Sequence, residues 1–134
     1  MPKLLAVLVA TLPLGANHGL PEVELRVDGT PVRVLIDTGA YTGIALRPAL
    51  VPPSARFAGQ RRFRDARGQS HEAREFSLDR LELAGLVERD VHGQELVHAP
   101  DFAPPNRDGY VGRELLSRWR LLFDVPAGRL QLHA

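Results

Sequence analysis

The sequence predicts an all-β domain with one short helix, and three observations lead to this fold class. The chain has 134 residues, 44% of them hydrophobic and 25% charged, which suits one compact domain with its own core. Short runs in which apolar and polar residues alternate are separated by turn residues such as glycine, proline and aspartate. Only residues 114–119 place apolar side chains at convincing helical spacing.

Net charge and cysteine content exclude several function classes. The 17 basic and 16 acidic residues give a net charge of +1, so the chain has no general attraction for nucleic acid or an anionic membrane. With zero cysteines there is no disulfide framework, no thiolate nucleophile and no Cys-ligated metal centre. We therefore expect no nucleic-acid partner.

The N-terminus resembles a secretory signal peptide. Lys3 supplies one positive charge, residues 4–12 form an apolar run broken only by Thr11, and Gly15 and Ala16 follow. The run is shorter than the ~20 residues that span a bilayer, so we expect no stable membrane span. This interpretation makes residues 1–16 a signal peptide, starts the mature domain (17–134) at Asn17, and predicts export to the periplasm or cell envelope. The alternative is an apolar first strand, which would make the protein cytoplasmic.

The next elements are two hairpins. Residues 22–36 alternate with a period of two around a turn at Asp28 and Gly29, and the second strand runs straight into Asp37. Residues 61–66 and 69–76 form a more polar hairpin around Arg67 and Gly68, which we expect to project from the core. Residues 56–67 hold five arginines, which we interpret as the solvated face of a strand pair rather than a nucleic-acid patch.

The C-terminal half continues the β pattern. Three leucines extend an apolar face toward Gly85, and residues 98–108 contain three prolines and predict a loop. The short helix at 114–119 follows, and then two strands at 121–125 and 129–133. The leucines are Leu78, Leu81 and Leu83.

The candidate chemistry lies at Asp37. The apolar run Val34-Leu35-Ile36 precedes it, which predicts a costly buried carboxylate, and buried carboxylates normally have a function. Gly39 allows a sharp turn and close approach of a ligand, and the Thr38 hydroxyl can lock the loop by hydrogen bonding. The structural alternative is an Asx-type turn at the end of a strand.

Two ordered blocks around this loop carry a family resemblance. Residues 32–40 read Val-Arg-Val-Leu-Ile-Asp-Thr-Gly-Ala, and residues 109–116 read Gly-Tyr-Val-Gly-Arg-Glu-Leu-Leu. The Gly68 hairpin lies between them, and residues 122–125 and 128–132 close the pattern. Together, over residues 22–132, they resemble the retropepsin-like aspartic proteases, the single-domain relatives of retroviral proteases, including bacterial envelope members. The resemblance implies a closed retropepsin-like barrel with the helix near its C-terminus.

The resemblance also implies an activity and a set of site residues. It implies an aspartic endopeptidase without metal or cofactor, acting on peptide or protein substrates, in which Asp37, Thr38 and Gly39 are catalytic. Peptide hydrolysis by carboxylates needs an acid and a base, and the chain has one Asp-Thr-Gly, so the second aspartate is Asp37 of another chain in a homodimer. We expect Arg129–His133 to pair between the subunits. The expected substrate-binding residues are Ala40, Tyr41, Arg67, Gly68, Tyr110, Val111 and Gly112.

Two departures from the family pattern stand out. Retroviral members usually carry an acid where this chain has Tyr41, and that acid pairs with the arginine matched by Arg113. The hairpin expected to close over the substrate has only Gly68 near its tip. A non-catalytic peptide-binding or dimerisation module with the same fold is the alternative function.

Other constellations are weaker. His71 and Glu72 lack the second histidine of a zinc-protease helix, and His92 and His98 fit solvated surface positions. None of the serines lies in a Gly-x-Ser-x-Gly motif. We therefore predict no metal site and no serine hydrolase.

Overall fold

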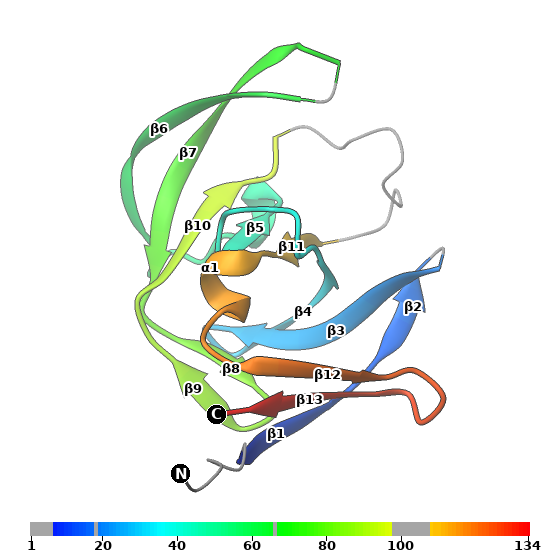
Figure 1. Cartoon of the computed structure of the whole chain (residues 1–134). Coiled ribbons are helices and arrows are strands. Elements are labelled where there is room, and N and C mark those ends of the chain that lie inside the picture. Colours follow the sequence, from blue (N-terminus) through cyan, green and yellow to red (C-terminus); the bar gives the residue numbers. More distant parts are fainter. Residues whose placement is uncertain (1–6, 18, 66, 98–107) are drawn as a thin grey trace, which may run out of the picture.

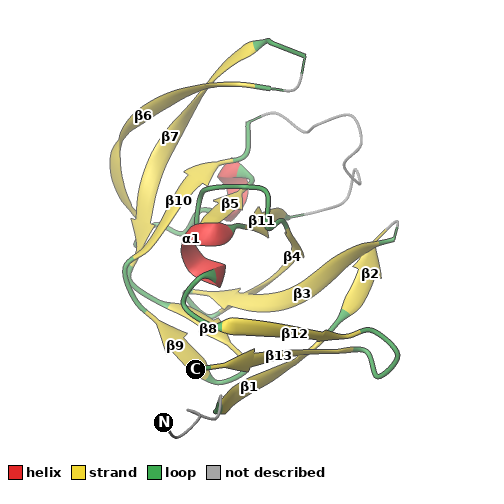
Figure 2. Ribbon diagram, in the orientation of Figure 1, coloured by secondary structure: helices red, strands yellow, loops and turns green. Residues whose placement is uncertain are grey.

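The computed structural model describes residues 7–17, 19–65, 67–97 and 108–134, and it confirms the all-β class with one short α-helix (Figures 1 and 2). The elements are β1 (Leu8–Pro13), β2 (Gly15–Asn17), β3 (Leu20–Val27), β4 (Thr30–Ile36), β5 (Ile44–Leu46), the 3₁₀ turn η1 (Pro48–Leu50), β6 (Arg56–Arg64), β7 (Ser70–Leu78), β8 (Leu81–Leu83), β9 (Leu86–Glu88), β10 (Val91–Glu95), β11 (Gly109–Val111), α1 (Arg113–Leu116), β12 (Arg120–Asp124) and β13 (Arg129–His133).

The strands form two sheets. The larger has the order β6-β7-β10-β5-β11-β4-β3-β8-β9, with β2 added on β3, and the smaller has the order β1-β13-β12. Among the described strands the large sheet is an open path, since β6 and β9 at its two ends do not pair with each other. The expected closure into a barrel is therefore not confirmed.

Both predicted hairpins are confirmed. Strands β3 and β4 are antiparallel around Asp28 and Gly29, whose φ angles of 48° and 85° are the left-handed values that a tight hairpin turn requires. Strands β6 and β7 pair from Arg56 opposite Ser77 to Arg64 opposite Ser70, with a register shift between Phe57 and Gly59, and β6 is exposed along almost all of its length. This polar hairpin (green in Figure 1) extends away from the rest of the molecule, as predicted.

The helix is shorter than predicted. Four residues are α-helical, and Leu115 and Leu116 are buried as their spacing implies. Arg118 and Trp119 instead make hydrogen bonds three residues back, to Leu115 and Leu116, so the chain tightens before β12 begins at Arg120. The apolar side chain of Trp119 still packs against the core.

The N-terminal apolar run contributes a strand to the fold. β1 pairs antiparallel with β13, and the Leu12 side chain is only 1% exposed. The structure thus has the arrangement of the first-strand alternative. Cleavage after Ala16 is a separate question and stays a prediction.

The C-terminal strands β12 and β13 are confirmed, but their role in assembly differs from expectation. β13 lies between β1 and β12 of the same chain, so both of its edges are already paired. The expected pairing of Arg129–His133 with a second chain is therefore wrong, and the open edges of this sheet belong to β1 and β12.

In the part of the chain that the structure covers, no helix is long and apolar enough to cross a membrane.

Candidate active site

Asp37 follows the last residue of β4 and begins a hydrogen-bonded loop. Its backbone N–H donates to Val111 O at 2.9 Å, and its own carbonyl accepts from Ala40 N at 3.1 Å. The Asp37 carboxylate accepts a hydrogen bond at Oδ1 from Gly39 N at 3.0 Å, so an Asx-type turn is present. Oδ2 has no hydrogen-bond partner among the described residues.

The expected burial of this carboxylate is wrong for the single chain. Asp37, Thr38 and Gly39 are all exposed. The β-branched neighbours that suggested burial lie within β4, whereas Asp37 stands where the chain turns out of the sheet. One chain therefore presents the Asp-Thr-Gly loop at an open surface.

Helix α1 and the residue before it hold this loop from behind. Arg113 N donates to Ala40 O at 2.8 Å, Glu114 N to Tyr41 O at 3.1 Å, and Gly112 N to Gly43 O at 3.1 Å. A Cβ atom on Gly112 would lie 2.2 Å from Thr42 O and 2.7 Å from Ala40 O. Only glycine allows this close approach of two backbone segments.

Strand β11 brings the second sequence block to the first. It lies between β4, to which it is parallel, and β5, to which it is antiparallel, with Val111 opposite Ile36 and Ile44. Asp108, just before β11, stabilises this pairing of strands. Its carboxylate accepts a hydrogen bond from Arg33 N at 2.8 Å and one from the Arg47 guanidinium at 3.1 Å. Sequence reasoning gave Asp108 no role, because its two partners lie far away in the chain.

The expected substrate-binding residues fall into three places. Ala40 and Tyr41 continue the Asp37 loop, Arg67 and Gly68 lie exposed at the tip of the β6–β7 hairpin, and Tyr110, Val111 and Gly112 lie in or beside β11. Val111 is 1% exposed and Gly112 is buried, so in the single chain these two support the loop and do not line an open surface. Tyr110 is half-buried, and its hydroxyl lies 3.5 Å from Gln94 Nε2.

The hairpin tip is organised by Asp65, which sequence reasoning missed. Its Oδ1 accepts from the backbone N–H groups of Arg67 (2.9 Å) and Gln69 (3.0 Å), and its Oδ2 lies 2.7 Å from His71 Nε2. The hydrogen bond from His71, followed by those from the two backbone groups, lowers the pKa of Asp65. Gly68 has a φ of 79°, so it is the residue that permits the turn.

Tyr41 carries two arginine contacts in place of the missing ion pair. The Arg113 guanidinium carbon lies 6.0 Å from the centre of the Tyr41 ring, and that of Arg61, on β6, lies 5.7 Å from it. These are cation–π distances. The hairpin and the Asp37 loop therefore meet at Tyr41.

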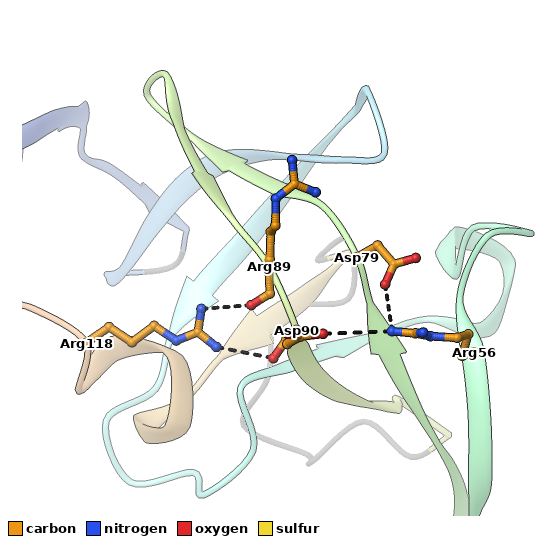
Figure 3. Close-up of polar contacts among 5 residues, drawn as sticks. All are labelled: Arg56, Asp79, Arg89, Asp90 and Arg118. Carbon is orange, nitrogen blue, oxygen red and sulfur yellow. Dashed lines mark hydrogen bonds and ion pairs between the residues drawn. The ribbon is translucent and has the colours of Figure 1, made fainter.

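A second set of contacts fixes the base of the hairpin (Figure 3). Arg118, after α1, donates to the backbone oxygens of Arg89 and Asp90 at 3.2 Å each. Arg56, at the start of β6, pairs with Asp79 at 2.7 Å and with Asp90 at 3.8 Å. The turn between β9 and β10 thus links the hairpin to the segment that supports the Asp37 loop.

The remaining candidates lie elsewhere. His92 Nδ1 is 3.6 Å from Glu114, and His98 lies outside the described residues, as do residues 99–107 of the predicted loop. Within the described ranges no group of three or more metal-ligating side chains gathers. A cleft of about 450 Å³ lies between β1, β3 and the β8–β9 turn, and none of the expected site residues lines it.

The fold is retropepsin-like by comparison with solved structures. The chain is similar to the crystal structure of a retropepsin-like aspartic protease from Rickettsia conorii, with a TM-score of 0.64 and 18% sequence identity, over 99% of this chain and 96% of that one. No protein-family model and no curated protein matches the sequence. At this identity the likeness establishes the fold and not the chemistry.

Proposed function

We propose that the protein is an aspartic endopeptidase whose active site forms from two copies of the Asp37 loop in a homodimer. The observation that carries the proposal is the Asp37 carboxylate: its Oδ1 is oriented by Gly39 N–H, and its loop is held by α1 and β11 within a retropepsin-like fold. An exposed carboxylate on a rigidly supported loop is suited to meet a partner across a two-fold axis.

The chemistry follows from two facing carboxyl groups. Two like charges in close contact cannot both ionise, so the pair holds one shared proton. The ionised carboxylate takes a proton from a water molecule, whose oxygen attacks the peptide carbonyl carbon, while the protonated carboxyl donates to the carbonyl oxygen. Collapse of the tetrahedral diol breaks the C–N bond: one of its hydroxyls returns a proton to the carboxylate that had donated one, and the proton taken from water passes to the leaving amine, which restores the shared proton of the pair. Acid and base are thus the same residue in two chains.

The surrounding residues have supporting roles in this proposal. Thr38, next to Asp37 on the exposed loop, would brace the two loops against each other across the symmetry axis. Gly39 leaves its backbone open for close approach of the substrate, and the β6–β7 hairpin would close over the peptide and exclude water. The partner subunit would also provide the desolvation that Asp37 lacks in one chain.

Subunit mixing tests the shared site directly. Asp37→Asn keeps the shape of the side chain and removes the shared proton, so the purified variant should have no peptidase activity. The variant is then mixed with the unaltered protein under conditions in which subunits exchange between dimers. Because mixed dimers are inactive, activity per unaltered chain should fall to about one half at one variant chain per unaltered chain, and to about one tenth at nine variant chains per unaltered chain.

The control makes the same chemical change at another exposed aspartate. Asp28→Asn lies on the exposed β3–β4 turn at a φ of 48°, a conformation that asparagine adopts readily, and should keep activity. Constant activity per unaltered chain across the mixing series would refute the shared site. Peptide binding without turnover by the unaltered protein would instead support the non-catalytic module.

A further inference from the structure

The surface beside the Asp37 loop has an excess of positive charge centred on Tyr41. Tyr41 is 60% exposed, and the guanidinium carbons of Arg61 and Arg113 lie 5.7 and 6.0 Å from its ring centre. Arg61 comes from the hairpin and Arg113 from α1, so two separate elements bring their charges to one residue.

The neighbouring carboxylates leave these charges largely unbalanced. Arg61 Nη1 lies 4.0 Å from Glu75, at the limit of an ion pair, and the Arg61 side chain is still 46% exposed. Arg113 is exposed and forms no ion pair with any described residue. Glu114, its neighbour in α1, faces His92 instead. The guanidinium N–H groups therefore remain available to an incoming acceptor.

The chain itself limits how far this cluster lies from the reacting bond. Tyr41 is four residues after Asp37, so their Cα atoms are separated by at most ~14 Å. An extended peptide covers that distance in about four residues. A substrate held at Asp37 and extending toward Tyr41 would bring a side chain to Arg61 and Arg113.

We propose that Arg61 and Arg113, arranged around Tyr41, bind a carboxylate of the substrate and make the enzyme prefer peptides with an acidic group within four residues of the cleaved bond. The inference rests on the proposed peptidase function and adds the substrate class. Two guanidinium groups present several N–H donors to one carboxylate, and closure of the hairpin would strengthen the attraction by removing water.

The test compares glutamate with glutamine, which differ in charge and hardly in shape. Peptides with both ends blocked carry Glu or Gln at each of the four positions on either side of the cleaved bond. At one or more positions Glu should raise kcat/KM on the order of tenfold over Gln. The same peptide with a free C-terminus tells whether a chain-end carboxylate is preferred to a side chain.

Variants assign the preference to these residues. Arg61→Gln and Arg113→Gln should each reduce the Glu-over-Gln ratio. Tyr41→Asp, which places a carboxylate close to both guanidinium groups, should abolish it. Arg62→Gln is the matched control, because Arg62 is the next residue on β6, points to the opposite face and is paired with Glu72 at 2.9 Å. Arg62→Gln should keep the ratio.

The outcomes separate the two proposals. Cleavage with equal rates for Glu and Gln peptides at every position and either chain end would overturn the charge preference and leave the peptidase function standing. Absence of any cleavage would count against the peptidase function alone. The preference for Glu over Gln peptides is then measured as a difference in binding affinity. Fluorescently labelled Glu peptides should bind the Asp37→Asn variant more tightly than Gln peptides, and equal affinity would overturn the inference.

Discussion

Removal of residues 1–16 should destabilise the protein, because this change deletes β1 from the fold. The truncated chain is the product expected if the N-terminus is a cleaved signal peptide. It loses the side chains of Ala10 and Leu12, which are 8% and 1% exposed, and the backbone partner of β13. Leu130 and Leu132 on β13, now 2% and 1% exposed, would lose the strand that lies beside them.

The size of the effect can be estimated from Leu12 alone. Truncation of a fully buried leucine to alanine costs about 2–5 kcal/mol, and deletion of the strand removes that packing together with the β1–β13 hydrogen bonds. Domains are stable by about 5–15 kcal/mol in total. The chain that starts at Asn17 should therefore be close to unfolded at room temperature, and Leu12→Ala should lose about 2–5 kcal/mol.

Urea unfolding followed by tryptophan fluorescence measures both variants. The chain has one tryptophan, Trp119, which packs against the core, and all samples should have one protein concentration because dimerisation adds to stability. Thr11→Ala is the control, since Thr11 is exposed on the same strand. If the chain that starts at Asn17 unfolds at the same urea concentration as the full chain, β1 is dispensable and the reasoning is refuted. Mass spectrometry of the protein from its native host then shows whether cleavage, and with it export, takes place.

Two further changes test the support of the site. Glu95 is 6% exposed, and hydrogen bonds from Arg74 lower its pKa. The pair therefore stabilises the native state fully above the unfolded-state pKa of about 4.3. This contribution is lost as the pH falls through the lower pKa of Glu95 in the native state. Glu95→Gln should cost about 1–2 kcal/mol at pH 7 in urea unfolding, with the difference shrinking below pH 4; a gap independent of pH would contradict this. Gly112→Ala should lower stability by about 1–3 kcal/mol and abolish peptide cleavage, because the new Cβ atom would clash with Thr42 O. An unchanged melting temperature and activity would show that the loop can move to accommodate the Cβ atom.

Elements with local signals were predictable from the sequence. The β3–β4 hairpin has turn residues in Asp28 and Gly29, and β12 and β13 are short runs rich in apolar residues on either side of a turn at Gly128. The three-residue strand β5 gave no such signal, and of β10 only the position of His92 is read as strand from the sequence. β10 contains Gly93, where a Cβ would lie 2.6 Å from the Phe76 ring, and ends at the buried Glu95, which only Arg74 of β7 explains. Such residues look like loop positions until their distant partners are known.

The motif of the candidate site could be found in the sequence, whereas much of the structure around it could not. Asp37, Thr38 and Gly39 could be identified because three neighbouring residues carry the motif. The exposure of Asp37 could not be predicted, because a run of apolar residues indicates that a strand is buried but not in which direction the chain leaves the strand. The two arginines that contact Tyr41 lie 20 and 72 positions further along the chain. The local sequence therefore showed that the usual acid is missing at this position, but not that arginine–ring contacts take its place.

The position of β11 also determines when the candidate site can exist during folding. β11 pairs with β4 across a separation of 75 residues, and contacts so distant in sequence form slowly because the entropy of loop closure is lost first. During synthesis Asp37 leaves the ribosome long before Val111, Arg113 and Glu114, which hold its loop. The loop gains these supporting backbone hydrogen bonds only after Glu114 has been made, so under the proposed peptidase function a nascent chain shorter than this lacks the supported site geometry.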